Sequence, residues 1–214
     1  MNTTLSLYTP LVPGNKYDPV YRQSFAKGNV TITLRPLQLT EDWPFISRWL
    51  LREITRKLPM TSHLPEKHLR ETYSIMLECD FAQPLMGLIN EQPAFLIEIC
   101  HGEKQGNGLD EGPHDFISGD HSIRLLLSPT ITHIRHGGDY TLFTCLHYFF
   151  SFNEVQRLVW ELHERDRQLL QLAQHVGFDK SIGRRWQGIQ VYLYSREKYQ
   201  LLSDIYPRYA QKQT

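Results

Sequence analysis

Cysteine is scarce in this chain, and its three residues, Cys79, Cys100 and Cys145, are an odd number with no CxxC spacing. The set therefore gives no sign of the paired framework that staples small secreted domains. Cys100 and Cys145 lie in apolar runs, where a thiol usually packs as a small hydrophobic side chain. Cysteine usage thus favours a reducing, cytoplasmic environment.

The chain also lacks an excess of either charge, because 23 Lys and Arg balance 23 Asp and Glu. A neutral protein has no overall field that attracts nucleic acid or an anionic membrane. The N-terminus lacks a basic stretch followed by an apolar core, and no segment reaches the roughly 18 apolar residues of a membrane helix. We therefore expect neither a nucleic-acid partner nor a membrane partner.

No Ser/Pro/Gly-rich linker or block of like charge divides the 214 residues. A chain of this length without a divider is expected to form one domain. We assign residues 1–29 to an irregular N-terminal arm, 30–198 to the folded domain and 199–214 to a C-terminal extension. Within the arm, "VYRQSF" (20–25) is a possible strand partner for the first strand of the domain.

Residue patterns beyond the arm predict alternating strands and helices. Strands are expected at 30–37, 84–90, 93–100, 120–128, 157–163 and 186–195, with a hairpin turn at Glu91-Gln92. Helices are expected after the N-cap Thr40, at 66–79, at 139–152 and in the stretch that ends at Gly177. The residues expected on the buried face of the first helix are Phe45, Ile46, Trp49 and Leu50. This order predicts a single mixed α/β sheet with helices on both faces.

The stretch "HIRHGGDY" (133–140) places Arg135, His136 and two glycines before an almost wholly apolar helix. The first amide groups of a helix have no partner inside it and carry partial positive charge, and glycine lets a ligand approach the backbone. The stretch therefore suits a pyrophosphate group, although an ordinary strand-to-helix loop has the same composition. His133 and His136 do not indicate a metal site, because no third ligand has suitable spacing.

The strand "IRLLLSP", the Arg-x-x-Gly loop, the apolar helix, the next strand and the helix ending in "QHVGF" together resemble the central part of the GNAT superfamily. Members are acyl-CoA-dependent N-acyltransferases. The resemblance implies a mostly antiparallel sheet of about seven strands, splayed between the strands at 120–128 and 157–163. It also implies that CoA pyrophosphate lies on the backbone of Arg135, His136, Gly137, Gly138, Asp139 and Tyr140. Amides around Leu126 and Leu127 would polarise the thioester carbonyl.

Within that superfamily, the sequence is similar to the acyltransferases that acylate hydroxylamines in siderophore biosynthesis. The likeness spans about residues 30 to 195 and is carried by "LRPLQLTEDWPFISRWL", "QPAFLIEIC", "GDHSIRLLLSP" and "WELHERDRQLLQLAQHVGF". It implies transfer from acetyl-CoA or succinyl-CoA, without a metal or a covalent enzyme intermediate, to N-hydroxyputrescine or N-hydroxycadaverine. There are three alternatives. The acceptor is N-hydroxylysine, or it is another amine on a protein, polyamine or drug, or the protein is a non-catalytic binding module. A monomer and a homodimer both remain open.

The aligned positions depart from that family's pattern. Arg124 stands where the family has a histidine, Glu161 matches its glutamate, His163 stands at its aspartate, and Asp166 stands at its asparagine. Strand alternation puts Arg124 and His163 on one face of neighbouring strands, so both can reach one cleft. We expect His163 to accept a proton, since imidazole titrates near neutral pH, and Arg124 to orient the acceptor or an acidic acyl group. A surface histidine at a strand end is the alternative for His163.

Glu98 is the only charged residue inside the run "AFLIEIC". It is either an exposed or paired strand residue or the partner of a cationic acceptor, such as the far ammonium of a hydroxylated diamine. We expect Glu98, Arg124 and Glu161 to bind the substrate, and His163, Arg124 and Asp166 to contribute to catalysis.

Overall fold

The computed structural model describes residues 7–8, 18–26, 29–57, 66–102, 116–182 and 188–203. They form one eight-stranded sheet in the order β1-β2-β3-β4-β5-β6-β8-β7. The strands are β1 (Tyr21–Phe25), β2 (Val30–Pro36), β3 (Ala82–Ile89), β4 (Gln92–His101), β5 (Asp120–Leu127), β6 (Arg157–His163), β7 (Asp179–Lys180) and β8 (Ile189–Ser195). The predicted sheet is confirmed, with β1 as the partner of β2. Only β7 was not expected, because two residues are too few to show a pattern.

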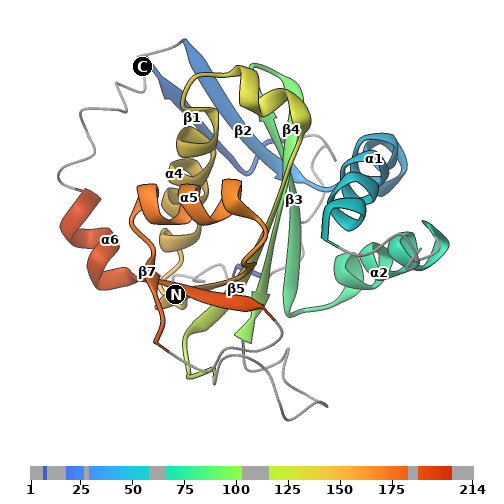
Figure 1. Ribbon diagram of the computed structural model, residues 1–214. Helices are drawn as coiled ribbons and strands as arrows, with labels where there is room; N and C mark the ends of the chain where they lie inside the picture. The colour runs from blue at the N-terminus through green and yellow to red at the C-terminus, as the bar shows by residue number, and fades with distance from the viewer. Residues whose placement is uncertain are drawn as a thin grey trace, which may run out of the picture.

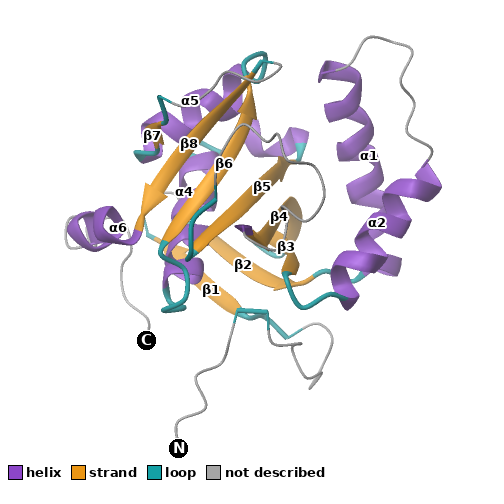
Figure 2. Ribbon diagram, turned by 90° about the horizontal axis from the view of Figure 1, so that it is seen from below, coloured by secondary structure: helices purple, strands orange, loops and turns teal. Residues whose placement is uncertain are grey.

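Helices cover both faces of the sheet, as predicted. The helices are α1 (Leu39–Lys57), α2 (Glu66–Glu78), α4 (Gly137–Phe150), α5 (Arg167–Val176) and α6 (Arg196–Ser203), with a 3-10 helix η1 at Pro129–His133. Figures 1 and 2 show α1 and α2 on one face and α4 and α5 on the other. Each face has its own apolar core, one around α1 and α2 and a larger one around α4.

The sheet is splayed where the resemblance implies. β5 and β6 are parallel neighbours, whereas every other pair of adjacent strands is antiparallel. Their pairing runs from Asp120 with Arg157 to Ile123 with Trp160 and then stops. Both strands are described in full and continue to Leu127 and His163. The two strands therefore separate over their last residues and leave space for a ligand.

The buried helix α4 connects β5 to β6 and begins two residues earlier than predicted. His136 precedes it in the left-handed conformation (φ 59°), and Gly137 is already helical. Ring stacking of Tyr140 on Phe25, with centroids 4.4 Å apart, anchors its first turn to the sheet. At its other end, the guanidinium of Arg196 donates to the carbonyls of Phe150 (3.0 Å), Phe152 and Val155 (2.9 Å). Both ends of α4 are thus fixed.

The hairpin between β3 and β4 turns one residue earlier than predicted. Its two turn residues are Asn90 (φ 47°) and Glu91 (φ 66°), not Glu91 and Gln92, and Gln92 pairs with Ile89. Two consecutive positive φ angles are typical of the tight turns that match strand twist. Asn90 tolerates this conformation, and its side-chain oxygen accepts a hydrogen bond from the amide of Thr31 at 2.8 Å.

The buried stripe of α1 differs from the predicted one by a single residue. Ile46, Trp49 and Leu50 are buried as expected, but Phe45 is 41% exposed. The buried residues follow the i, i+3, i+4 spacing of a helix, and Phe45 falls beside that stripe. Trp43 is also buried, which agrees with its assignment to the core.

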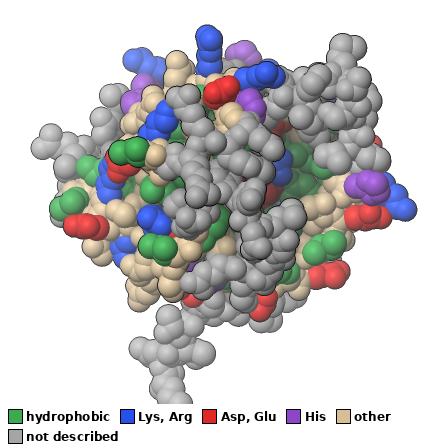
Figure 3. Space-filling view, turned by 60° about the horizontal axis from the view of Figure 1, so that its bottom comes forward, with side chains coloured by type: hydrophobic (Ala, Val, Ile, Leu, Met, Phe, Trp, Pro, Cys, Tyr) green, Lys and Arg blue, Asp and Glu red, His purple; other side chains and the backbone are tan. Residues whose placement is uncertain are grey.

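The described surface carries charges of both signs. On the face shown in Figure 3, acidic and basic side chains are intermingled. Among the described helices, none combines the length and apolarity needed to cross a bilayer.

Candidate active site: a cleft between the splayed strands

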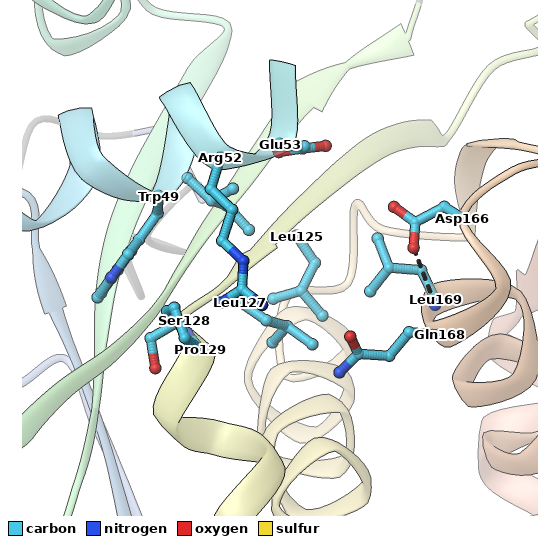
Figure 4. Close-up of a pocket in the computed structure, with 11 residues that line it drawn as sticks. Trp49, Arg52, Glu53, Leu125, Leu127, Ser128, Pro129, Asp166, Gln168 and Leu169 are labelled. Carbon is cyan, nitrogen blue, oxygen red and sulfur yellow. Dashed lines mark hydrogen bonds between the residues drawn. The ribbon is translucent and has the colours of Figure 1, made fainter. Parts of the chain in front are cut away.

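A cleft opens where β5 leaves β6, and it encloses about 470 Å³ including space open to solvent (Figure 4). Three elements line it: α1, the end of β5 with the following turn, and the start of α5. The lining residues are Trp49, Arg52, Glu53, Leu125, Leu126, Leu127, Ser128, Pro129, Asp166, Gln168 and Leu169. Of the site residues predicted from the sequence, three line the cleft: Leu126, Leu127 and Asp166.

Asp166 occupies the wall beside α5 because it is the N-cap of that helix. Its Oδ1 accepts the amide of Leu169 at 3.4 Å, and the residue is only 3% exposed. A carboxylate is stabilised at a helix N-terminus by the orphan amides and the helix dipole. Figure 4 shows its other carboxylate oxygen directed toward the cleft. The chain therefore holds a buried acid at the edge of the space between the strands.

The wall formed by α1 contains residues that the sequence analysis did not select. Trp49 was expected in the core, and it is buried there as well as lining the cleft. Arg52 and Glu53 follow it at i+3 and i+4; Glu53 continues the stripe with a partly buried charge, whereas Arg52 is exposed at its edge. In the sequence, a charged residue on an otherwise apolar face of the helix was the signal that could have identified this wall.

A polar cluster lies beside the cleft on the α1/α2 face of the sheet. Tyr73 of α2 donates from its hydroxyl to Glu98 Oε1 at 2.5 Å. Arg124 lies directly across from Glu98 on β5, with Nη1 3.7 Å from Glu98 Oε2 and Nη2 4.0 Å from Glu53 Oε2. Two carboxylates thus share one guanidinium, and we call these four residues the carboxylate cluster.

Burial sets the electrostatics of the carboxylate cluster. Desolvation raises the pKa of Glu98, while the charge of Arg124 and the hydrogen bond from Tyr73 act in the opposite direction. The nearby Glu98 raises the pKa of Arg124. Arg124 stays half exposed, with 52% of its side chain accessible, whereas Glu98 is 7% accessible. Glu98 is thus buried, accepts the Tyr73 hydroxyl and faces the guanidinium of Arg124.

His163 and Glu161 lie on the same face of β6 but do not line the cleft. His163 Nδ1 accepts the amide of Arg165 at 3.1 Å, so a neutral ring carries its hydrogen on Nε2. That Nε2 lies 3.3 Å from the position that a Cβ on Gly188 would take. The imidazole is therefore held between the turn after β6 and the start of β8. Glu161 is exposed.

The start of α4 combines close packing with available amides. A Cβ on Gly137 would stand 3.0 Å from the carbonyl oxygen of Ile131, and one on Gly138 would stand 3.2 Å from Leu172 Cδ1 of α5. The amide of Gly137 donates to Ile134 O, and that of Tyr140 donates to His136 O. A helix supplies no acceptor for its remaining first-turn amides, which belong to Gly138 and Asp139. These two amides are the ones that a phosphate would meet.

The side chains around that turn differ in exposure. Tyr140 is buried in the core, while Arg135 and His136 are exposed. The Asp139 carboxylate lies between two imidazoles, with Oδ2 3.0 Å from His136 Nδ1 and Oδ1 3.0 Å from His175 Nδ1. Asp139 thus accepts a hydrogen bond from each of two histidines beside the helix N-terminus. Among the described residues, no group of three acidic, histidine or cysteine side chains is arranged to hold a metal ion.

Known structures share this architecture. Aminoglycoside acetyltransferase AAC(6')-Ib, solved in complex with coenzyme A, matches with a TM-score of 0.65 and 16% identity over 80% of this chain and 99% of its own. RimJ from Mycobacterium smegmatis, solved with CoA-disulfide, matches with a TM-score of 0.61 and 14% identity over 91% of this chain and 96% of its own. An uncharacterized protein from Bacillus halodurans matches with a TM-score of 0.66 and 16% identity, over 87% and 95%.

A comparison with curated protein sequences gives no significant match. A family model does match, over residues 38–182, and it describes an acetyltransferase (GNAT) domain. This segment runs from α1 to beyond β7 and contains every residue that lines the cleft. Because the match covers more than half of the chain, the protein belongs to the acetyltransferase (GNAT) domain family and is an acyltransferase.

Proposed function

We propose that this acyltransferase moves the acyl group of an acyl-CoA to the hydroxylamine nitrogen of a small N-hydroxylated diamine, forming a hydroxamate for siderophore assembly in the cytoplasm. The acceptor class is N-hydroxyputrescine or N-hydroxycadaverine. The observation that carries the proposal is the buried Glu98, held beside the cleft close to Glu53, with both carboxylates facing the guanidinium of Arg124. Such a site suits a compact acceptor with a second, cationic end.

The proposed binding site for the acyl-CoA donor is formed by the start of α4 and the end of β5. The amides of Gly138 and Asp139, with the exposed Arg135 and His136 nearby, suit the pyrophosphate of CoA. A pantetheine arm leading from there enters the gap between β5 and β6, and its thioester then reaches Leu126 and Leu127. RimJ and AAC(6')-Ib are described with CoA species bound, which supports the same co-substrate for this family member.

The proposed chemistry is direct transfer. The hydroxylamine nitrogen is much less basic than an alkylamine, so it arrives largely neutral and attacks the thioester carbon. The new C–N bond gives a tetrahedral oxyanion, which needs preorganised N–H donors at the end of β5. Collapse breaks the C–S bond, and the thiolate of CoA leaves. The proton lost by nitrogen goes to Asp166, which lines the cleft, and Asp166 then gives that proton to the departing thiolate, which releases free CoA thiol and restores the carboxylate.

Thiol release with a panel of acceptors tests the function. We expect acetyl-CoA or succinyl-CoA to be consumed with N-hydroxyputrescine and N-hydroxycadaverine at least about 10-fold faster, in kcat/KM, than with putrescine and cadaverine. The plain diamines have the same length and far charge, so they isolate the hydroxylamine. Equal rates for both sets would exclude hydroxylamine specificity. Failure of folded protein to bind either acyl-CoA in a calorimetric titration would instead indicate a non-catalytic module.

Removal of the Glu98 charge tests the acceptor site. We expect Glu98→Gln to raise KM for the N-hydroxylated diamine about 10-fold, because the ammonium end loses a buried ionic partner. Acyl-CoA affinity should stay within about twofold, since Glu98 does not line the donor side of the cleft. Steady-state kinetics and calorimetric titration of acetyl-CoA measure these two effects.

The pH dependence supplies an independent check on Glu98. Because burial raises the pKa of Glu98, its carboxyl takes up a proton at a higher pH than an exposed glutamate does. Acceptor affinity should therefore fall as the pH falls through that raised pKa, and Glu98→Gln should lose this dependence. Glu66→Gln on α2, a carboxylate outside the carboxylate cluster that accepts a hydrogen bond from Trp43, is the matched control and should keep it. An unchanged KM in Glu98→Gln at every pH would remove Glu98 from the acceptor site.

A further inference from the structure

Arg52 projects from α1 into the cleft. Figure 4 shows its side chain running toward Leu127 and Ser128 at the end of β5. It lines the cleft with apolar neighbours that include Trp49, Leu126 and Leu127. It forms no ion pair with any side chain that the structure describes. A guanidinium at the expected position of the thioester is therefore available to a ligand.

Arg124, in contrast to Arg52, already has carboxylate partners. Its guanidinium faces Glu98 at 3.7 Å and Glu53 at 4.0 Å, so it is already engaged by two carboxylates. An anionic group that approached Arg124 would have to compete with these two carboxylates. Arg124 is also absent from the residues that line the cleft. The carboxylate cluster is thus suited to cations, and Arg52 is the cleft residue suited to anions.

We propose, on the basis of the function proposed above, that Arg52 is a specificity-determining residue that binds a substrate carboxylate in the cleft. Arg52 is exposed at the edge of the cleft, and its planar guanidinium can pair with a carboxylate through two parallel hydrogen bonds. The carboxylate has two possible sources: the free end of a dicarboxylic acyl group, as in succinyl-CoA, or the α-carboxylate of an N-hydroxylated amino acid. The carboxylate cluster and Arg52 then bind opposite charges at two ends of one site.

A matrix of two donors and two acceptors distinguishes the sources. Acetyl-CoA and succinyl-CoA are each combined with N-hydroxycadaverine and N-hydroxylysine, and kcat/KM is measured by thiol release. For Arg52→Ala we expect a loss of about 30-fold on combinations that contain the recognised carboxylate, relative to acetyl-CoA with N-hydroxycadaverine. A loss confined to succinyl-CoA assigns the carboxylate to the donor, and a loss confined to N-hydroxylysine assigns it to the acceptor. Arg52→Lys should recover part of the loss, because it keeps the charge without the bidentate geometry.

Arg48→Ala is the matched control. Arg48 is exposed on α1, one turn before Arg52, and it does not line the cleft, so its removal should leave all four combinations unchanged. Equal effects of Arg52→Ala on all four combinations, or no effect on any, would overturn the proposal. If the wild-type protein turns over none of the four, the proposed function is wrong. Calorimetric titration of each donor and acceptor into wild type and Arg52→Ala then still tests Arg52, because selective loss of affinity for a carboxylated ligand needs no turnover.

Discussion

Replacement of Asp166 by asparagine is expected to lower kcat about 100-fold, the range in which a positioned general base contributes to a reaction. The carboxylate lies at the edge of the cleft, and asparagine cannot take up the proton that the attacking nitrogen loses. Stability should be almost unchanged, because asparagine is as good an N-cap as aspartate and still accepts the amide of Leu169. Single-turnover kinetics and thermal unfolding measure the two effects separately.

The control for Asp166 is Asp166→Ala, which removes both the charge and the cap. It should lose the same activity and, in addition, about 1 kcal/mol of stability. His163→Ala tests the competing base. Because Nδ1 of His163 is occupied by the Arg165 amide and Nε2 faces Gly188, we expect less than about a fivefold change in kcat. A full rate in Asp166→Asn, together with a large loss in His163→Ala, would transfer the role to the histidine.

Loss of the Arg157 side chain is expected to destabilise the fold by about 3 to 5 kcal/mol, as breaking a buried ion pair does. Arg157 donates to both oxygens of Asp120 at 2.7 Å, and Asp120 is fully buried. Arg157→Ala leaves that carboxylate without its counter-charge. The two residues form the first paired position of β5 and β6, so they hold the closed end of the splay. Urea unfolding measures the change.

Two further variants test whether the lost stability comes from breaking the buried ion pair. Lys198→Ala removes a cation from Asp179, which is 71% exposed, and should cost no more than about 1 kcal/mol. Asp120→Asn in the Arg157→Ala background should recover part of the stability, because it removes the uncompensated charge. A loss of less than about 1 kcal/mol in Arg157→Ala would contradict a structural role for the pair.

The elements that the sequence predicts best are those with a strong local residue pattern. β4, β5 and β6 are apolar runs that are buried over most of their length, and α4 is an almost wholly apolar helix, so their composition identifies them. The splay was expected from the resemblance. The start of α4 and the turn at Asn90 were each misplaced by one or two residues. At both points a non-glycine residue adopts a positive φ, His136 in one case and Asn90 in the other, and residue pattern alone does not register this.

The candidate site was harder to predict because it depends on which way side chains turn. Strand alternation correctly puts Arg124 and His163 on one face, but it does not reveal that the turn after β6 binds the imidazole. Arg52 and Glu53 come from a helix that ends more than 60 positions before β5 begins, and only folding brings them to the cleft. The charge of Glu53 on the buried stripe of α1 was the visible signal for this wall.

The order of strands across the sheet has a practical consequence for fragment design. β1 and β2 come from before residue 38 and β8 from after residue 182, yet β2 pairs with β3 and β8 pairs with β6. A recombinant piece trimmed to 38–182 would present β3 and β6 as bare edges, with unpaired amides and carbonyls that invite intermolecular pairing. A recombinant fragment should therefore include residues from Tyr21 to Ser203. This range also keeps the hydrogen bonds from Arg196 to the carbonyls at the end of α4.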